Sequence, residues 1–182
     1  GWMVQDCFHR IHKISDSTIT EIRNILSRIP ILFADFDDTL TQRPETHQAN
    51  RSIHAILDKL KSMRNKQKKI KAFMNASSRE KIELFYSRVL RGFTREELYS
   101  LYREVIAEED PQRAIRVNAN FFDVCRRIHR NTGAITIPLV ILSLNSCDFI
   151  QLWYESKQQE FEAFQRAEGI KIVLACIIGN QI

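Results

Sequence analysis

The chain has 182 residues, of which 44 % are hydrophobic and 27 % charged, and its formal net charge is +5. This length and apolar content allow one domain with a sizeable core, or a core domain with a modest insertion, and they exclude disorder for most of the chain. The cysteines are scattered without a Cys-x-x-Cys pair, which disfavours a zinc site or a disulfide framework and favours a reducing, cytoplasmic setting. No apolar run approaches the roughly 18 residues of a transmembrane helix, so we expect a soluble protein.

The N-terminal segment, residues 1–29, predicts a helical extension. Over residues 6–29, isoleucine and leucine recur at spacings that suit one or two amphipathic helices. Asp16 or Ser17 is a plausible N-cap between them, and Pro30 ends the element.

The stretch ILFADFDDTLTQ follows, at residues 31–42. Residues 31–34 have the length and apolarity of a strand buried on both faces, which is typical of a parallel sheet covered by helices. Asp35, Asp37 and Asp38 come at the carboxyl end of this strand, where carboxylates repel each other and are costly to dehydrate. If strand geometry persists, Asp35 and Asp37 lie on one side, and such a pair invites either a shared proton or a hard divalent cation.

About a hundred residues with helical character come next, and they give almost no strand signal. Four stretches, at 50–63, 78–90, 94–109 and 118–133, predict helices. Thr94 with Glu97 three residues later has the pattern of a capping box. We interpret residues 43–133 as a helical block that stands apart from the sheet.

Most of the positive charge is local to residues 59–71, KLKSMRNKQKKIK, which contain seven basic side chains and no acid. We interpret this segment as a solvated surface, since no aromatic side chain is interleaved to stack on bases. The segment therefore disfavours nucleic acid as a partner.

Two further apolar runs complete an α/β pattern. Residues 137–144 predict a strand that ends in small polar residues, a helix follows over 148–168, and residues 170–180 predict a third strand. In an open parallel sheet, ligands bind at the carboxyl ends of the strands, where Asp35, Asp37 and Ser143 are expected to meet.

These residues resemble a known family. The sequence DFDDTLT after ILFA resembles the first motif of the haloacid dehalogenase superfamily of phosphohydrolases, Asp-x-Asp-x-Thr at the end of the first strand, and PLVILSLN resembles its second motif. The gap between them is similar to the helical cap of the phosphoserine phosphatase-like and nucleotidase-like branches. The resemblance implies a Rossmann-like α/β core at 30–42 and 134–182, with an inserted helical cap at 43–133.

The resemblance also implies a mechanism and a set of site residues. Asp35 is the expected nucleophile that forms an aspartyl-phosphate, and Asp37 the expected general acid and base. Mg²⁺ is expected on the Asp35 carboxylate and the Asp37 main-chain carbonyl. Thr39 is expected to fix the loop, while Ser143 and the neighbouring Asn145 are expected to hold the phosphoryl group of a small phosphomonoester.

Two parts of the family pattern are not evident, a lysine beside the nucleophile and later acids that complete the metal site. Lys157 and Lys171 are weak replacements, and Cys147 lacks an activating partner in the sequence. Three explanations compete: a piece of a longer phosphatase with an incomplete sheet, which we favour; a non-catalytic relative; or an enzyme with a reduced metal site. We expect activity well below that of an intact family member. The alternative function is a binding or scaffold protein that uses its basic 59–71 segment.

Overall fold

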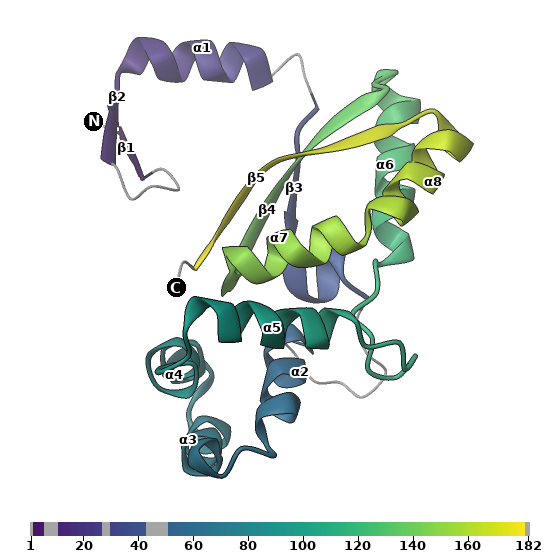
Figure 1. The fold of residues 1–182 in the computed structure, drawn as a ribbon. Helices are drawn as coiled ribbons and strands as arrows, with labels where there is room; N and C mark the ends of the chain where they lie inside the picture. The colour runs from purple at the N-terminus through teal and green to yellow at the C-terminus, as the bar shows by residue number, and fades with distance from the viewer. Residues whose placement is uncertain (1, 6–10, 27–29, 43–50, 181–182) are drawn as a thin grey trace.

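The computed structural model describes residues 2–5, 11–26, 30–42 and 51–180 (Figure 1). The strands are β1 (Trp2–Gln5), β2 (Ile11–Ile14), β3 (Leu32–Asp35), β4 (Thr136–Ser146) and β5 (Lys171–Asn180). The helices are α1 (Asp16–Leu26), α2 (Arg51–Leu60), α3 (Arg64–Asn75), α4 (Ser78–Leu84), α5 (Arg95–Ile106), α6 (Ala119–Thr132), α7 (Cys147–Ser156) and α8 (Gln158–Glu168), with short turns η1 (Phe36–Leu40) and η2 (Phe85–Val89). Residues 6–10, 27–29 and 43–50, which belong to the predicted N-terminal extension and helical cap, lie outside the described residues.

A parallel sheet forms in the order β3-β4-β5. Residues 32–35 pair with residues 139–142, and β4 pairs with β5 along most of its length. The connection from β3 to β4 contains α2 to α6, and the connection from β4 to β5 contains α7 and α8. Both connections are crossovers between parallel strands. The predicted α/β class with a parallel sheet is therefore confirmed.

One face of the sheet carries the core. Ala34 of β3 and Leu139 and Ile141 of β4 are buried, because their side chains alternate toward the face on which α7 packs. Trp153 of α7 is fully buried there, and its ring meets that of Phe36 edge-to-face with centroids 5.0 Å apart. The Trp153 indole N–H donates to the main-chain carbonyl of Ile115 at 2.8 Å, so this large side chain is satisfied as well as packed.

The opposite face of the sheet is open, which corrects the expectation that the first strand is buried on both faces. Phe33 of β3 is 56 % exposed, and Leu142 of β4 and Ile178 of β5 are 41 % and 55 % exposed. The physical reason is topological. Both crossovers advance in the same direction across the sheet, so right-handed connections place their helices on one face.

The helical layer formed by α2 to α5 lies below the end of the sheet at which β4 and β5 finish (Figure 1). It contacts the α/β part of the chain through α5, which packs against α7. The Thr94–Glu97 capping box is present, with the Glu97 N–H donating to Thr94 Oγ1 at 3.2 Å and the Thr94 N–H to Glu97 Oε2 at 2.8 Å. Among the described residues, no helix is long and apolar enough to cross a membrane.

α6 belongs with the sheet helices by its contacts, although it falls within the predicted 43–133 block. Its Phe122 ring stacks on Phe164 of α8 with centroids 4.6 Å apart, and Arg126 Nε donates to Glu168 at 2.9 Å. The separate helical layer therefore ends before α6 begins at Ala119.

Two predicted helices differ from the observed elements. Within the helical prediction over 6–29, α1 is a helix, but Ile11–Ile14 is strand β2, which pairs antiparallel with β1. Cross-strand pairing therefore prevails over helical spacing in this stretch. The helix predicted over 148–168 is interrupted at Lys157, where the backbone turns to φ −98° and ψ 6° and separates α7 from α8.

Candidate active site at the carboxyl ends of the strands

The turn η1 carries the acidic motif from the end of β3 toward the helical layer. Phe36 anchors it, because its ring is fully buried against Trp153 and Phe149. Asp38 adopts a left-handed conformation, φ 62° and ψ 3°, which a carboxylate side chain tolerates better than most. The hydroxyl of Thr41 closes the turn, accepting from the Asp38 N–H and donating to the Phe36 carbonyl, both at 3.1 Å.

The two carboxylates of the motif occupy unlike environments, and the strand geometry that would have put them on one side does not persist beyond Asp35. Strand β3 ends at Asp35, and the chain leaves strand geometry in the turn that follows. Asp35 remains exposed, and its Oδ1 accepts the Phe36 N–H at 2.7 Å. Asp37 is buried. Two residues apart in sequence, one carboxylate faces solvent and the other faces protein.

Asp37 is held by Ser52, in the first turn of α2. The Ser52 N–H donates to Asp37 Oδ1 at 3.1 Å, and the Ser52 hydroxyl lies 2.7 Å from Oδ1 and 2.9 Å from Oδ2. The first N–H groups of a helix have no partner inside the helix and carry its positive dipole end, so a carboxylate satisfies them. The start of the helical layer is thus tied directly to the acidic turn.

A directed chain of hydrogen bonds leads from η2 to this carboxylate. Asn145 Oδ1 accepts the Ser146 N–H at 2.7 Å and the Tyr86 hydroxyl at 3.2 Å, which fixes the amide orientation. Asn145 Nδ2 must then donate, and it donates to the Ser52 hydroxyl. With its lone pair engaged by Asn145, the Ser52 hydroxyl directs its own proton to Asp37. We name Tyr86, Asn145, Ser52 and Asp37 the site network.

Electrostatics distinguish the members of this network. Burial raises the pKa of Asp37; the hydrogen bonds from Ser52 lower it, and the charges of Asp35 and Asp38 raise it further. Burial likewise raises the pKa of the Tyr86 phenol, so the first donor of the chain keeps its proton. Asp37 therefore retains a proton to higher pH than an ordinary aspartate does.

Thr39 and Ser143, the other predicted site residues, are not members of the site network. The Thr39 side chain is exposed, and its carbonyl accepts from Asn118 Nδ2 at 3.1 Å; the hydroxyl that ties the turn belongs to Thr41. Ser143 lies at the end of β4, and its Oγ accepts the Asn145 N–H at 3.0 Å. The structure thus brings Asn145 into contact with the acidic turn through Ser52, while Thr39 and Ser143 contribute nearby hydroxyl groups.

The end of β5 closes on the same region. Asn180 Nδ2 donates to the Leu144 carbonyl, and a Cβ atom placed on Gly179 would lie 2.7 Å from the Asn145 carbonyl oxygen. A side chain at position 179 therefore cannot be accommodated without a shift of the backbone. All three parallel strands end at this site.

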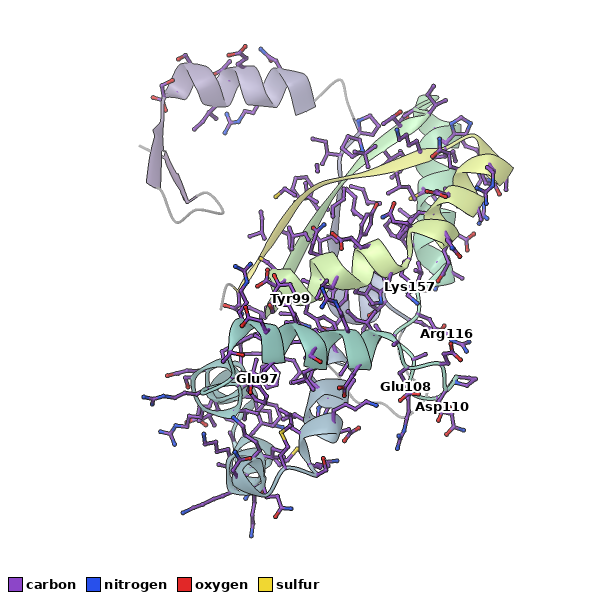
Figure 2. The ribbon with its side chains drawn as sticks, viewed as in Figure 1. Glu97, Tyr99, Glu108, Asp110, Arg116 and Lys157 are labelled. Atoms are coloured by element: carbon purple, nitrogen blue, oxygen red, sulfur yellow. The ribbon has the colours of Figure 1, made fainter. Side chains whose placement is uncertain are left out.

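The weaker candidates lie elsewhere or are unreactive. Lys157 follows α7, about 15 Å along the helix from the end that β4 enters, and Figure 2 shows it beside Arg116. Lys171 opens β5 at the opposite edge of the sheet from Asp35. Burial raises the pKa of the Cys147 thiol, which disfavours a thiolate nucleophile. Neither lysine supplies the missing cation.

The basic segment 59–71 is not one free basic face. Lys59 lies 3.7 Å from Glu108, and Lys61 lies 2.6 Å from Asp58. Lys66 is buried, and its ammonium donates to the carbonyls of Val89 and Arg91 at 3.0 and 2.9 Å. These contacts favour the interpretation of residues 59–71 as a solvated surface. They disfavour an anion-binding site there.

The donor set bears on metal binding. Among the residues that the structure describes, no three His, Cys, Asp or Glu side chains gather closely enough to hold a metal ion. Asp35 offers an exposed carboxylate, whereas the Asp37 carboxylate is engaged by Ser52. One carboxylate with a main-chain carbonyl fits the habit of Mg²⁺, which keeps several waters and takes few protein ligands.

Comparison of the chain with protein-family models, with curated proteins and with solved structures found no significant match. The functional argument therefore depends on the site geometry. Sequence reasoning missed Ser52 and Tyr86, both of which lie in the helical layer. Ser52 could have been predicted from its place in the sequence, since it is a hydroxyl residue in the first turn of the helix that follows the acidic motif.

Proposed function

We propose that the protein is a haloacid dehalogenase-like phosphohydrolase that cleaves a small phosphomonoester through an aspartyl-phosphate. The observation that carries this proposal is the contrast between two carboxylates of one turn: Asp35 is exposed, and Asp37 is buried with a raised pKa. Displacement at phosphorus requires one ionised nucleophile and one protonated acid side by side. Environments that separate the proton affinities of neighbouring carboxyl groups are typical of such sites.

Asp35 acts as the nucleophile in this proposal. Its carboxylate attacks phosphorus, the bond to the leaving oxygen breaks, and Asp37 donates its proton to that oxygen. In the second step Asp37, now ionised, takes a proton from water as the water attacks the aspartyl-phosphate, which restores Asp35 and releases phosphate. The Ser143 hydroxyl accepts the Asn145 N–H and keeps its own proton for a phosphoryl oxygen, whereas Asn145 is buried and its side-chain amide donates to Ser52.

Mg²⁺ would be held by the Asp35 carboxylate and the Asp37 main-chain carbonyl, and it would neutralise the repulsion between Asp35 and a phosphate dianion. Because few protein oxygens are available, we expect weak metal affinity and slow turnover. The main chain around η1 is kept in place by the packing of Phe36 and the hydrogen bonds of Thr41.

The helical layer has a defined part in this proposal. Asp37 donates to a substrate only after its carboxyl group exchanges its contact with Ser52 for one with the leaving oxygen. Ser52 belongs to α2, so displacement of α2 and reorientation of Asp37 are coupled. Closure of the layer over a bound substrate would also exclude bulk water.

The test is phosphate release from an aryl phosphate by the 182-residue chain, with and without Mg²⁺, beside Asp35→Asn. We expect slow, Mg²⁺-dependent release that Asp35→Asn reduces by at least a hundredfold. Asp123→Asn is the matched control, because Asp123 lies on the exposed surface of α6 and contacts Arg126. Its rate should equal that of the wild type.

Two results would contradict the proposal. Release that survives Asp35→Asn would place the nucleophile elsewhere. No release from a folded chain, checked by circular dichroism, would point to a non-catalytic relative of the family.

A further inference from the structure

The open face of the sheet is an apolar surface that no helix of the described fold covers. We define it by outward apolar side chains of the three strands: Phe33, Val140, Leu142, Leu144, Val173 and Ile178. Phe33 and Leu144 are 56 % and 67 % exposed. Parallel sheets are almost always covered on both faces, so this exposure is unusual for a finished surface.

The topology explains why the chain does not cover this face with the helices that it has. Both right-handed crossovers advance from β3 through β4 to β5, so α6, α7 and α8 all belong to the other face. In Figure 1 the helical layer lies beyond the strand ends, not over the open face. A cover has to come from elsewhere.

We propose that the open face binds the same face of a second copy of this chain, so that the protein is a two-fold symmetric dimer with two sheets stacked face to face. Stacked sheets pack about 10 Å apart through interdigitated side chains of this kind. This inference does not depend on the proposed phosphatase activity.

The area supports a second copy. At roughly 100 Å² for each of the five large side chains with the greatest exposure, one face offers about 500 Å² of apolar surface, near the upper end for a monomer. Two such faces bury about 1,000 Å² between them, which reaches the size of a specific interface before any polar rim is added.

The charge distribution also suits self-association. The centre of the open face is formed by Val140 and Leu142, which a two-fold axis would place against their own copies. The charged side chains that share this face, Asp35 and Lys171, lie at opposite ends of the strands. Like charges are therefore kept from meeting at the axis, where they would be buried.

The experiment is sedimentation equilibrium of the 182-residue chain between about 1 and 100 μM, a range that detects dissociation constants in the micromolar range. We expect a dimer at the upper concentrations. Leu144→Glu and, separately, Phe33→Glu should each weaken dimerisation at least tenfold, because each would bury an unpaired charge. Both positions are exposed in one copy, so both variants should fold.

Met74→Glu is the matched control. Met74 is 49 % exposed on α3, away from the sheet, and its substitution should leave dimerisation unchanged. A wild-type chain that stays monomeric at 100 μM would overturn the proposal, whether the face is then bare or covered by a segment of the same chain. A dimer that persists in both Leu144→Glu and Phe33→Glu would also overturn it, since another surface would form the contact.

Discussion

The two faces of the sheet are built from similar residues but lie in opposite environments. Ile141 and Leu142 are neighbours on β4, yet Ile141 is fully buried and Leu142 is 41 % exposed. Strand sequence does not explain this contrast, because both faces are apolar. The direction of the crossovers does explain it, since it decides on which side the helices pack. Coverage of a parallel sheet is thus a property of chain path as much as of strand composition.

The largest expected effect compares these two neighbours directly. Ile141→Ala should lower the free energy of unfolding by about 3 kcal/mol, because it leaves a cavity in the close-packed core. Leu142→Ala should cost less than about 1 kcal/mol, because water already reaches its side chain. Urea denaturation of both variants at about 1 μM protein, where the dimer is least populated in the range tested, measures both losses. Equal losses would show that the open face is covered within a single chain.

A second prediction concerns the point at which β5 closes on the site. Gly179→Ala should destabilise the protein by about 2 kcal/mol, since the new Cβ atom would meet the Asn145 carbonyl and the Cys147 sulfur at 2.7 and 3.3 Å. Gly92→Ala is a useful comparison, because Gly92 has open space around it and is constrained by its φ of 93° alone. A Gly179→Ala variant as stable as wild type would mean that the strand ends separate easily.

Sequence patterns predicted the elements of this fold better than their surroundings. The strands of the parallel sheet and the capping box of Thr94 follow from local periodicity and side-chain chemistry, which act over a few residues. The exposed face of β3, in contrast, depends on the path of a part of the chain about a hundred residues later, which crosses from one strand to the next. Strand β2 was missed for the same reason, because a local pattern does not reveal pairing with another strand. Its pairing with β1 outweighs a helical pattern.

The site shows the same division. The sequence predicted that Asp35, Asp37 and Ser143 meet at one edge, because carboxyl ends of parallel strands meet there. It did not predict that Asp37 turns inward, which depends on Ser52, fifteen residues later. Tyr86 is further still from its partner Asn145 in sequence. Local patterns identify acidic groups, but their proton affinities depend on partners brought in by tertiary structure.

A third prediction uses the sign of the Asp37 pKa. Burial raises it in the folded state above its unfolded value, so the folded protein binds this proton more tightly. The resulting stability is complete below the unfolded pKa and is lost as pH rises through the folded pKa. Asp37→Asn removes this loss of stability at high pH, because asparagine does not ionise. The side-chain carbonyl of the asparagine still accepts from Ser52. We expect the variant to gain about 1 kcal/mol over wild type at pH 7 and less at pH 4.

Urea denaturation of both proteins across this pH range measures the difference. Asp123→Asn, on the exposed surface, should show no such trend. If the advantage of Asp37→Asn is larger at pH 4 than at pH 7, the carboxyl group is not held in its neutral form by burial, and the role of proton donor would lose its physical support.

The smallest expected effect lies in the turn that separates exposed Asp35 from buried Asp37. Asp38 has a positive φ, and its buried Oδ1 has no hydrogen-bond partner among the described residues. Asp38→Gly relieves the backbone strain and removes the unpaired oxygen, against the added freedom of glycine in the unfolded chain. We expect a net gain of about 0.5 kcal/mol. Asp38→Ala removes the oxygen but keeps the Cβ atom at positive φ, so it should be less stable than Asp38→Gly by about 1 kcal/mol. Equal stability of the two variants would show that the turn carries no backbone strain at this position, and that the carboxylates are separated by the contacts of Phe36 and Ser52 alone.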